Sequence, residues 1–221
     1  MIKVNIQLFA KGGRGGKRKR GGGSGKWAGG NVGREVPATL KEALGKKGKP
    51  MSEADAWFDA NPFFSDNYKE FSFNCQRCVF AYEMRRRGYD VEAQPTYQGD
   101  TMPINTNWTK AMSGMTEASV GRSTEKATLD AIRSQMAKWG NGSRAIVKVR
   151  WAGGNSGHVF NVEYTNNKLH VYDVQSNKRT TGEQYIKDAL PYTTLRYTTL
   201  YRTDNAQPTD EMRKMVYTKK K

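Results

Sequence analysis

The apolar positions of the first half of the body are spaced as in helices. Ser52-Glu53-Ala54-Asp55 has the form of a helix N-cap, and it predicts a short helix that ends before Asn61-Pro62. A longer helix is predicted from Cys75 to Arg87, since Gly88 follows as a stop signal. A third is predicted over residues 123–139, whose apolar side chains keep helical spacing. Residues 94–122 show neither period and are expected to be loop-like.

The second half of the body is rich in β-branched and aromatic residues. Strands are predicted at residues 145–151 and 159–164, and Asn166-Asn167 is a turn signal after which residues 169–174 return as a hairpin partner. A short helix is expected near residues 183–190, followed by a last strand at residues 193–202. Helices followed by an antiparallel sheet predict the α+β class.

The positive charge lies at the ends of the chain. The net charge is +16, of which residues 1–50 carry +11 and residues 209–221 carry +3, so that residues 51–208 carry +2. We therefore predict four segments: a leader or docking segment at residues 1–10, a basic Gly-rich flexible arm at residues 11–50, a folded domain at residues 51–208 and a basic C-terminal tail at residues 209–221.

Neither of the first two segments has the pattern of a membrane anchor. Apolar residues alternate in residues 1–10, which indicates a short strand or a docking peptide, and Asn5 and Gln7 interrupt the apolar core that a signal peptide needs. We expect no signal peptide and no membrane association. The basic residues 11–34 fit a solubilising linker or a tether to nucleic acid or to an acidic surface, and Lys17–Arg20 also fits a nuclear-localisation run.

The candidate chemistry begins with Asn74-Cys75-Gln76-Arg77-Cys78 at the start of the long helix. The positive end of the helix dipole favours a thiolate there, and free backbone N–H groups can bind an oxyanion. A nucleophile, a redox pair and two buried apolar side chains all remain open for these cysteines. Cys75 is the better nucleophile candidate because it lies at the helix tip, whereas Cys78 lies one turn further in.

A histidine and an aspartate of the hairpin complete the pattern. With the turn at Asn166-Asn167, the residue opposite His158 lies near position 175, so Asp173 is a diagonal neighbour that can orient the imidazole. Gln175 lies on the same face and can bind substrate or hold the site. His170 pairs near Glu163 and is interpreted as ordinary. The twelve-residue spacing of the two histidines does not fit a zinc finger, so we expect no metal and no cofactor.

These motifs together resemble the papain-fold toxins of the glutamine deamidase type. The likeness runs through Asn74-Cys75-x-x-Cys78 to Val91, then Gly157-His158-x-Phe160-Asn161-Val162 and Asp173-x-Gln175, and it covers roughly residues 60–205. The resemblance implies a papain-like α+β fold in which Cys75 is the nucleophile, His158 the base and Asp173 its orienting partner, with Asn74, Gln175 and Cys78 in support. It also implies a host protein substrate bearing a glutamine.

The first ten residues resemble the leader of structural proteins from phages of Gram-positive bacteria. That resemblance implies a phage or mobile-element context, with phage capsid components and an immunity protein as candidate partners, and a place in a virion or in the bacterial cytoplasm. Three functions stay open: a Cys-His-Asp glutamine deamidase, a papain-like cysteine peptidase, and a non-enzymatic phage structural protein whose basic arms contact DNA.

Overall fold

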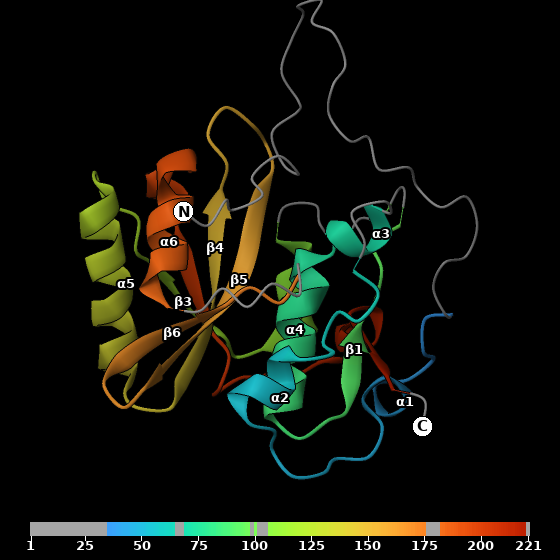
Figure 1. The fold of residues 1–221 in the computed structure, drawn as a ribbon. Coiled ribbons are helices and arrows are strands. Elements are labelled where there is room, and N and C mark those ends of the chain that lie inside the picture. Colours follow the sequence, from blue (N-terminus) through green and yellow to red (C-terminus); the bar gives the residue numbers. More distant parts are fainter. Residues whose placement is uncertain (1–34, 65–68, 98–99, 101–105, 176–181, 220–221) are drawn as a thin grey trace, which may run out of the picture.

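The fold is an antiparallel sheet covered by helices on both faces (Figure 1). This computed structural model describes residues 35–64, 69–97, 100, 106–175 and 182–219. The leader at residues 1–10 and the arm up to residue 34 lie outside the described residues. The α+β class predicted from the sequence is confirmed.

The central sheet has five strands in the order β3-β7-β4-β5-β6. All four pairings are antiparallel, and the strands are β3 (Thr116–Ser119), β4 (Ser143–Arg150), β5 (Gly157–Thr165), β6 (Lys168–Tyr172) and β7 (Thr199–Arg202). β5 and β6 form the predicted hairpin, with Asn166 and Asn167 in the left-handed conformation at φ 53° and 58°. Asparagine tolerates that conformation better than most residues, which explains why the turn falls there.

Helices α5 (Glu125–Trp139) and α6 (Glu183–Ala189) cover one face of this sheet, and α4 (Cys75–Arg86) lies on the other (Figure 1). On the first face a buried apolar cluster contains Ile132 of α5, Val147 of β4 and Ile186 of α6. On the second face Phe80 of α4 and Ile146 of β4 belong to another buried cluster. Successive side chains of β4 therefore lie on opposite faces of the sheet, as strand geometry requires.

Smaller elements complete the fold. They are α1 (Leu40–Leu44), α2 (Glu53–Trp57), α3 (Lys69–Ser72), the 3₁₀ turns η2 (Asn107–Ala111), η3 (Leu190–Tyr192), η4 (Leu195–Tyr197) and η5 (Asp210–Lys214), and two antiparallel strand pairs, β1 (Val91–Ala93) with β9 (Val216–Thr218) and β2 (Met112–Ser113) with β8 (Gln207–Pro208). Ser52 caps α2 by accepting a hydrogen bond from the N–H of Asp55, as its sequence predicted.

The structure differs from the predicted segments at both ends of the body. Residues 209–218, predicted as a basic tail, contain η5 and β9, and Met212, Met215 and Val216 are fully buried. Within the predicted arm, α1 buries Ala43 and Leu44. Apolar side chains in short segments stabilise these ends, although the neighbouring lysines dominate the composition.

Two further expectations about secondary structure are wrong. The segment 94–122 is not simply loop, since it contains η2, β2 and β3, and β3 forms an edge of the main sheet. The last strand does not begin at Thr193, because η4 occupies residues 195–197 and β7 starts at Thr199. The strands involved, β2, β3 and β7, have only two to four residues each, which is too short for a clear two-residue period in the sequence.

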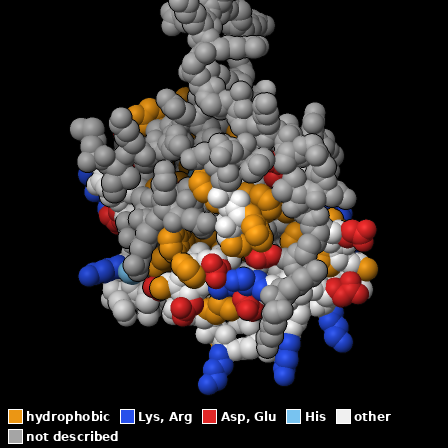
Figure 2. All heavy atoms as spheres, turned by 45° about the vertical axis from the view of Figure 1, so that its right-hand side comes forward, with side chains coloured by type: hydrophobic (Ala, Val, Ile, Leu, Met, Phe, Trp, Pro, Cys, Tyr) orange, Lys and Arg blue, Asp and Glu red, His pale blue; other side chains and the backbone are white. Residues whose placement is uncertain are grey.

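On the surface of the body, basic side chains are interspersed with acidic ones. Figure 2 shows the side of α1 and α3, where lysines and arginines lie among aspartates and glutamates without forming a continuous basic surface. This distribution agrees with the net charge of +2 over residues 51–208.

The end of α4 is attached to the sheet by buried ion pairs. The fully buried carboxylate of Glu83 accepts hydrogen bonds from Arg144 at 2.8 and 2.9 Å, from Arg87 at 2.7 Å and from the Thr203 hydroxyl at 3.0 Å. Burial alone would raise the pKa of Glu83, but the two guanidiniums lower it below its usual range. This carboxylate therefore joins α4 to β4 and to the residue after β7.

We expect Glu83→Gln to lower the free energy of unfolding by about 3 kcal/mol, since it leaves two partly buried arginines without their counter-charge. Chemical denaturation of the two proteins measures the difference. The matched control is Asp130→Asn, which removes an acid of an exposed ion pair with Lys126 and should barely change stability. Equal effects of the two substitutions would contradict the role given to the Glu83 cluster.

Candidate active site

Cys75 is the first residue of α4, and its thiol lies where the helix begins. Asn74 is at the N-cap position, and its carbonyl accepts hydrogen bonds from the N–H groups of Arg77 and Cys78. The first N–H groups of a helix have no acceptor within the helix, so they are available to an anion beside the thiol. The Cys75 side chain is 3% exposed, and its Sγ lies 3.4 Å from Oε1 of Gln76.

His158 and Asp173 lie side by side at one end of the β5–β6 hairpin. The hairpin pairs Asn161 with Tyr172 and Thr165 with Lys168, so the same register places His158 opposite position 175, as predicted. Nε2 of His158 is 3.1 Å from Oδ2 of Asp173. Gly157 permits β5 to begin here, since a Cβ at this position would lie 2.2 Å from the Val149 carbonyl oxygen.

Asp173 is held by three further hydrogen bonds. The Tyr185 hydroxyl of α6 donates to Oδ2 at 2.6 Å, and the Gln175 N–H donates to Oδ1 at 3.2 Å. The indole of Trp57 in α2 donates to the Asp173 carbonyl at 3.3 Å. Burial by itself would raise the pKa of Asp173, but His158 and the hydrogen bonds from Tyr185 and the Gln175 N–H lower it, so the carboxylate stays ionised.

His158 interacts with the Cys75 thiol as well as with this carboxylate, since both act to raise the pKa of its imidazole. Because Asp173 engages Nε2, the second ring nitrogen, Nδ1, is the candidate for proton exchange with a thiol. The Trp151 ring stacks on the imidazole with centroids 6.2 Å apart and an interplanar angle of 14°. Burial acts to lower the pKa of His158, yet Asp173 and Cys75 outweigh it and raise that pKa to about 10. The site therefore favours an imidazolium at neutral pH.

Cys78 has a different environment, one turn further along α4. Its Sγ–H donates to Oδ1 of Asn74 at 3.2 Å, and burial raises the pKa of its thiol well above the usual range. A thiol that stays protonated is a poor nucleophile. Both cysteines are free.

Three buried side-chain amides link the segment before α4 to the segment after β6. Asn61 donates to the carbonyls of Phe71 and Gln175 at 3.0 and 2.6 Å, and Nδ2 of Asn74 donates to Oδ1 of Asn61 at 3.0 Å. Nε2 of Gln175 donates to the Ser72 carbonyl at 2.9 Å. The residues before α4 are thus hydrogen-bonded directly to those that follow β6.

The six residues singled out in the sequence, Asn74, Cys75, Cys78, His158, Asp173 and Gln175, meet at one place. Sequence reasoning missed Asn61, Tyr185, Trp57 and Trp151, whose roles depend on contacts between distant segments. The only sequence signal for Asn61 is its position before Pro62, which suggested a helix end rather than a polar network. His170 pairs with Glu163, as predicted, several residues away from His158 along the hairpin.

Among the described residues, no group of three or more His, Cys, Asp or Glu side chains could hold a metal ion. In that same part of the chain, no helix has the length and apolar character needed to cross a membrane.

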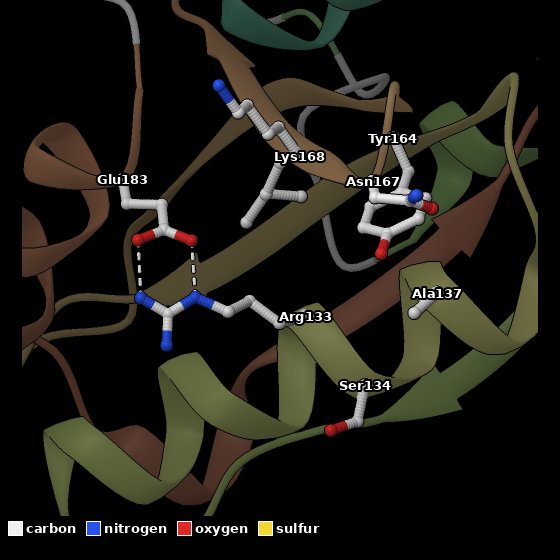
Figure 3. A pocket seen from close by; sticks show the side chains of 8 residues that line it. Arg133, Ser134, Ala137, Tyr164, Asn167, Lys168 and Glu183 are labelled. Carbon is white, nitrogen blue, oxygen red and sulfur yellow. Dashed lines mark hydrogen bonds and ion pairs between the residues drawn. The ribbon is translucent and has the colours of Figure 1, made fainter.

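A cavity of about 580 Å³ lies apart from this constellation, between α5, the β5–β6 turn and α6 (Figure 3). Its lining includes Asn167 and Lys168, at the opposite end of the hairpin from His158. Arg133 points across it to Glu183 and forms a two-pronged ion pair. This cavity therefore lies away from Cys75 and His158.

A helix-tip thiol, an imidazole on a strand and a buried aspartate thus lie together on a mixed helix and antiparallel-sheet body. Residues 73–178 match the family model described as papain fold toxin 1, glutamine deamidase. The matched residues include Cys75, His158 and Asp173. No curated protein and no solved structure is significantly similar to this chain. The match supports a papain-fold toxin of the deamidase type, acting on a glutamine of a protein.

Proposed function

We propose that this protein is a cysteine-dependent glutamine deamidase in which Cys75 is the nucleophile, His158 transfers protons and Asp173 orients the imidazole. The observation that supports it most strongly is the position of His158, whose Nε2 lies 3.1 Å from Oδ2 of Asp173 and whose pKa is raised by both Asp173 and Cys75. Nucleophile, base and orienting acid within hydrogen-bond reach are the signature of covalent catalysis by a thiol.

In the first step, the Cys75 thiolate attacks the side-chain carboxamide carbon of the substrate glutamine. The C–N bond breaks as the His158 imidazolium gives its proton to the leaving nitrogen, so ammonia departs and a thioester remains. In the second step, His158 takes a proton from water, whose oxygen attacks the thioester. The products are a glutamate and the regenerated thiol, and the step needs no cofactor.

Negative charge develops on the carboxamide oxygen in both steps. The first N–H groups of α4 lie beside the thiol, and each such donor contributes about 3 kcal/mol to stabilising the transition state. The Asp173 carboxylate holds the imidazole in place and stabilises its positive charge, which is the function its buried hydrogen bonds suit.

A papain-like peptidase would use the same residues, so the product decides between the two activities. We expect glutamine-containing proteins and peptides to release ammonia and to gain the mass of an amide-to-acid exchange, with the peptide backbone intact. Mass spectrometry of a peptide that carries one glutamine measures both products. Backbone cleavage without ammonia release would overturn the deamidase proposal in favour of the peptidase.

The biological setting is also part of the proposal. We infer a toxin of a phage or mobile element that acts on a host protein, with an immunity protein and phage capsid components as candidate partners, in a virion or in the bacterial cytoplasm. The alternative, an inert structural protein with DNA-contacting arms, predicts salt-sensitive DNA binding that is lost on deletion of residues 1–35, together with no deamidation under any condition.

A further inference from the structure

A second, smaller cavity of about 300 Å³ lies at the tip of the β4–β5 hairpin. It is lined by the turn residues Gly153, Gly154 and Asn155 and, across from them, by Arg150, Thr194, Arg196 and Tyr197. Two guanidiniums share one aromatic ring there, since the Cζ atoms of Arg150 and Arg196 lie 5.0 and 4.9 Å from the Tyr197 centroid. Tyr197 is 40% exposed, so the arrangement opens to the surface.

Neither of these arginines has a carboxylate partner among the described residues. Arg150 is held by the Gly154 carbonyl at 3.1 Å and by Oδ1 of Asn155 at 2.8 Å, both of them uncharged acceptors. Other arginines of the body do have carboxylate partners, as Arg86 has Glu163 and Arg144 has Glu83. Two like charges against one ring repel each other, so this cavity favours an anion that the part of the chain described by the structure does not supply.

The cavity is connected to the candidate active site through Trp151, the residue after Arg150, whose ring stacks on the His158 imidazole. β4 pairs with β5 so that Arg150 lies opposite Gly157, the residue before His158. Strand alternation places the Arg150 side chain on the α4 side of the sheet, with Arg144 and Ile146. His158 pairs with Val149 and begins on the other side, so the two side chains approach each other around the end of the strands. α4 runs beside β5 with its Cys75 end toward His158, since Asn161 bonds to the Val79 carbonyl and Glu163 to Arg86.

We propose that this arginine cavity binds an acidic segment of the protein substrate whose glutamine enters the Cys75 site. The inference rests on the proposed deamidase function and names how its substrate is recognised. Guanidiniums bind carboxylates through paired hydrogen bonds, and the Thr194 hydroxyl lies in the same lining as a further donor. A compact cavity with two cations suits one or two acidic side chains, whereas single-stranded nucleic acid needs a longer basic groove with stacking surfaces.

The test compares two peptides that contain one glutamine, flanked in one by glutamates and in the other by serines. Arg196→Gln is the first variant, because Arg196 makes no described hydrogen bond that folding would lose; the double variant with Arg150→Gln follows. We expect the wild-type preference for the acidic peptide, measured as the ratio of kcat/KM values, to fall about tenfold in Arg196→Gln and further in the double variant. The matched control is Lys126→Gln, an exposed cation of α5 on the other face of the sheet, which should keep the preference.

Binding is measured separately, by calorimetry of the same peptides with the Cys75→Ala protein, so that substrate recognition does not depend on turnover. Tighter binding of the acidic peptide that is lost in Arg196→Gln supports the cavity even if no peptide is deamidated, in which case only the proposed function fails. Equal binding of both peptides, or an acidic preference that survives the double variant, overturns the inference. So does tighter binding of oligothymidylate than of the acidic peptide.

Discussion

Replacing Cys75 with alanine is expected to abolish glutamine deamidation, with a loss of at least about 10⁴-fold in rate. The substitution removes the thiol at the tip of α4 that, together with Asp173, raises the pKa of His158. Cys78→Ala should keep most of the turnover, since the Cys78 thiol is buried, stays protonated and bonds to Asn74. Its expected cost is in stability, because alanine leaves a small void and one lost hydrogen bond within α4.

Ammonia release from a glutamine peptide measures both variants, and the melting temperature separates folding from chemistry. Iodoacetamide gives an independent reading, because a thiolate reacts and a protonated buried thiol does not. We expect alkylation of Cys75 before Cys78 at neutral pH. If Cys78 is labelled first and Cys75→Ala keeps its activity, the assignment of Cys75 as the nucleophile is wrong.

Asp173→Asn is expected to leave the protein folded and to lower the rate by about 10⁴-fold, as the equivalent change does in a serine-protease triad. An amide at this position can stabilise the wrong tautomer of His158 and supplies no negative charge to the imidazolium. Tyr185→Phe is the graded comparison, since it removes one hydrogen bond to Asp173 but keeps the ring that packs on Phe160. We expect Tyr185→Phe to lower the rate of deamidation far less than Asp173→Asn does.

The pH profile distinguishes this account from a purely structural role for Asp173. The active form needs a thiolate and an imidazolium, so activity declines at high pH where His158 loses its proton. Asp173 and Cys75 raise the pKa of His158 to about 10 against the effect of burial. Removing the carboxylate therefore lowers that pKa, and the alkaline limb of the residual activity should move to lower pH. An unmoved limb would contradict the pairing.

The parts of the site that depend on local sequence patterns could be predicted from the sequence. The Cys75 helix ends where Gly88 predicted, and the Asn166-Asn167 turn fixes the hairpin register that brings His158 beside Asp173. Both results follow from short-range rules, since one turn determines the position of every residue on the return strand.

Contacts between segments that are distant in the sequence could not be predicted from local patterns. Asn61 bonds to the Gln175 carbonyl across 114 residues of sequence, and no pattern in either segment indicates the other. The three-residue strand β9 pairs with β1 although lysines surround it, so charge suggested a tail where packing forms a strand. Burial of Met212 and Met215 outweighs the local composition there.

The most direct test of the account is to trap the covalent intermediate. Protein mixed with a glutamine peptide and quenched in acid should carry the peptide as a thioester, and digestion should place it on Cys75. Hydroxylamine should release it, and Cys75→Ala should show no adduct while Cys78→Ala still does. An adduct on Cys78, or deamidation that proceeds in Cys75→Ala, would contradict the account.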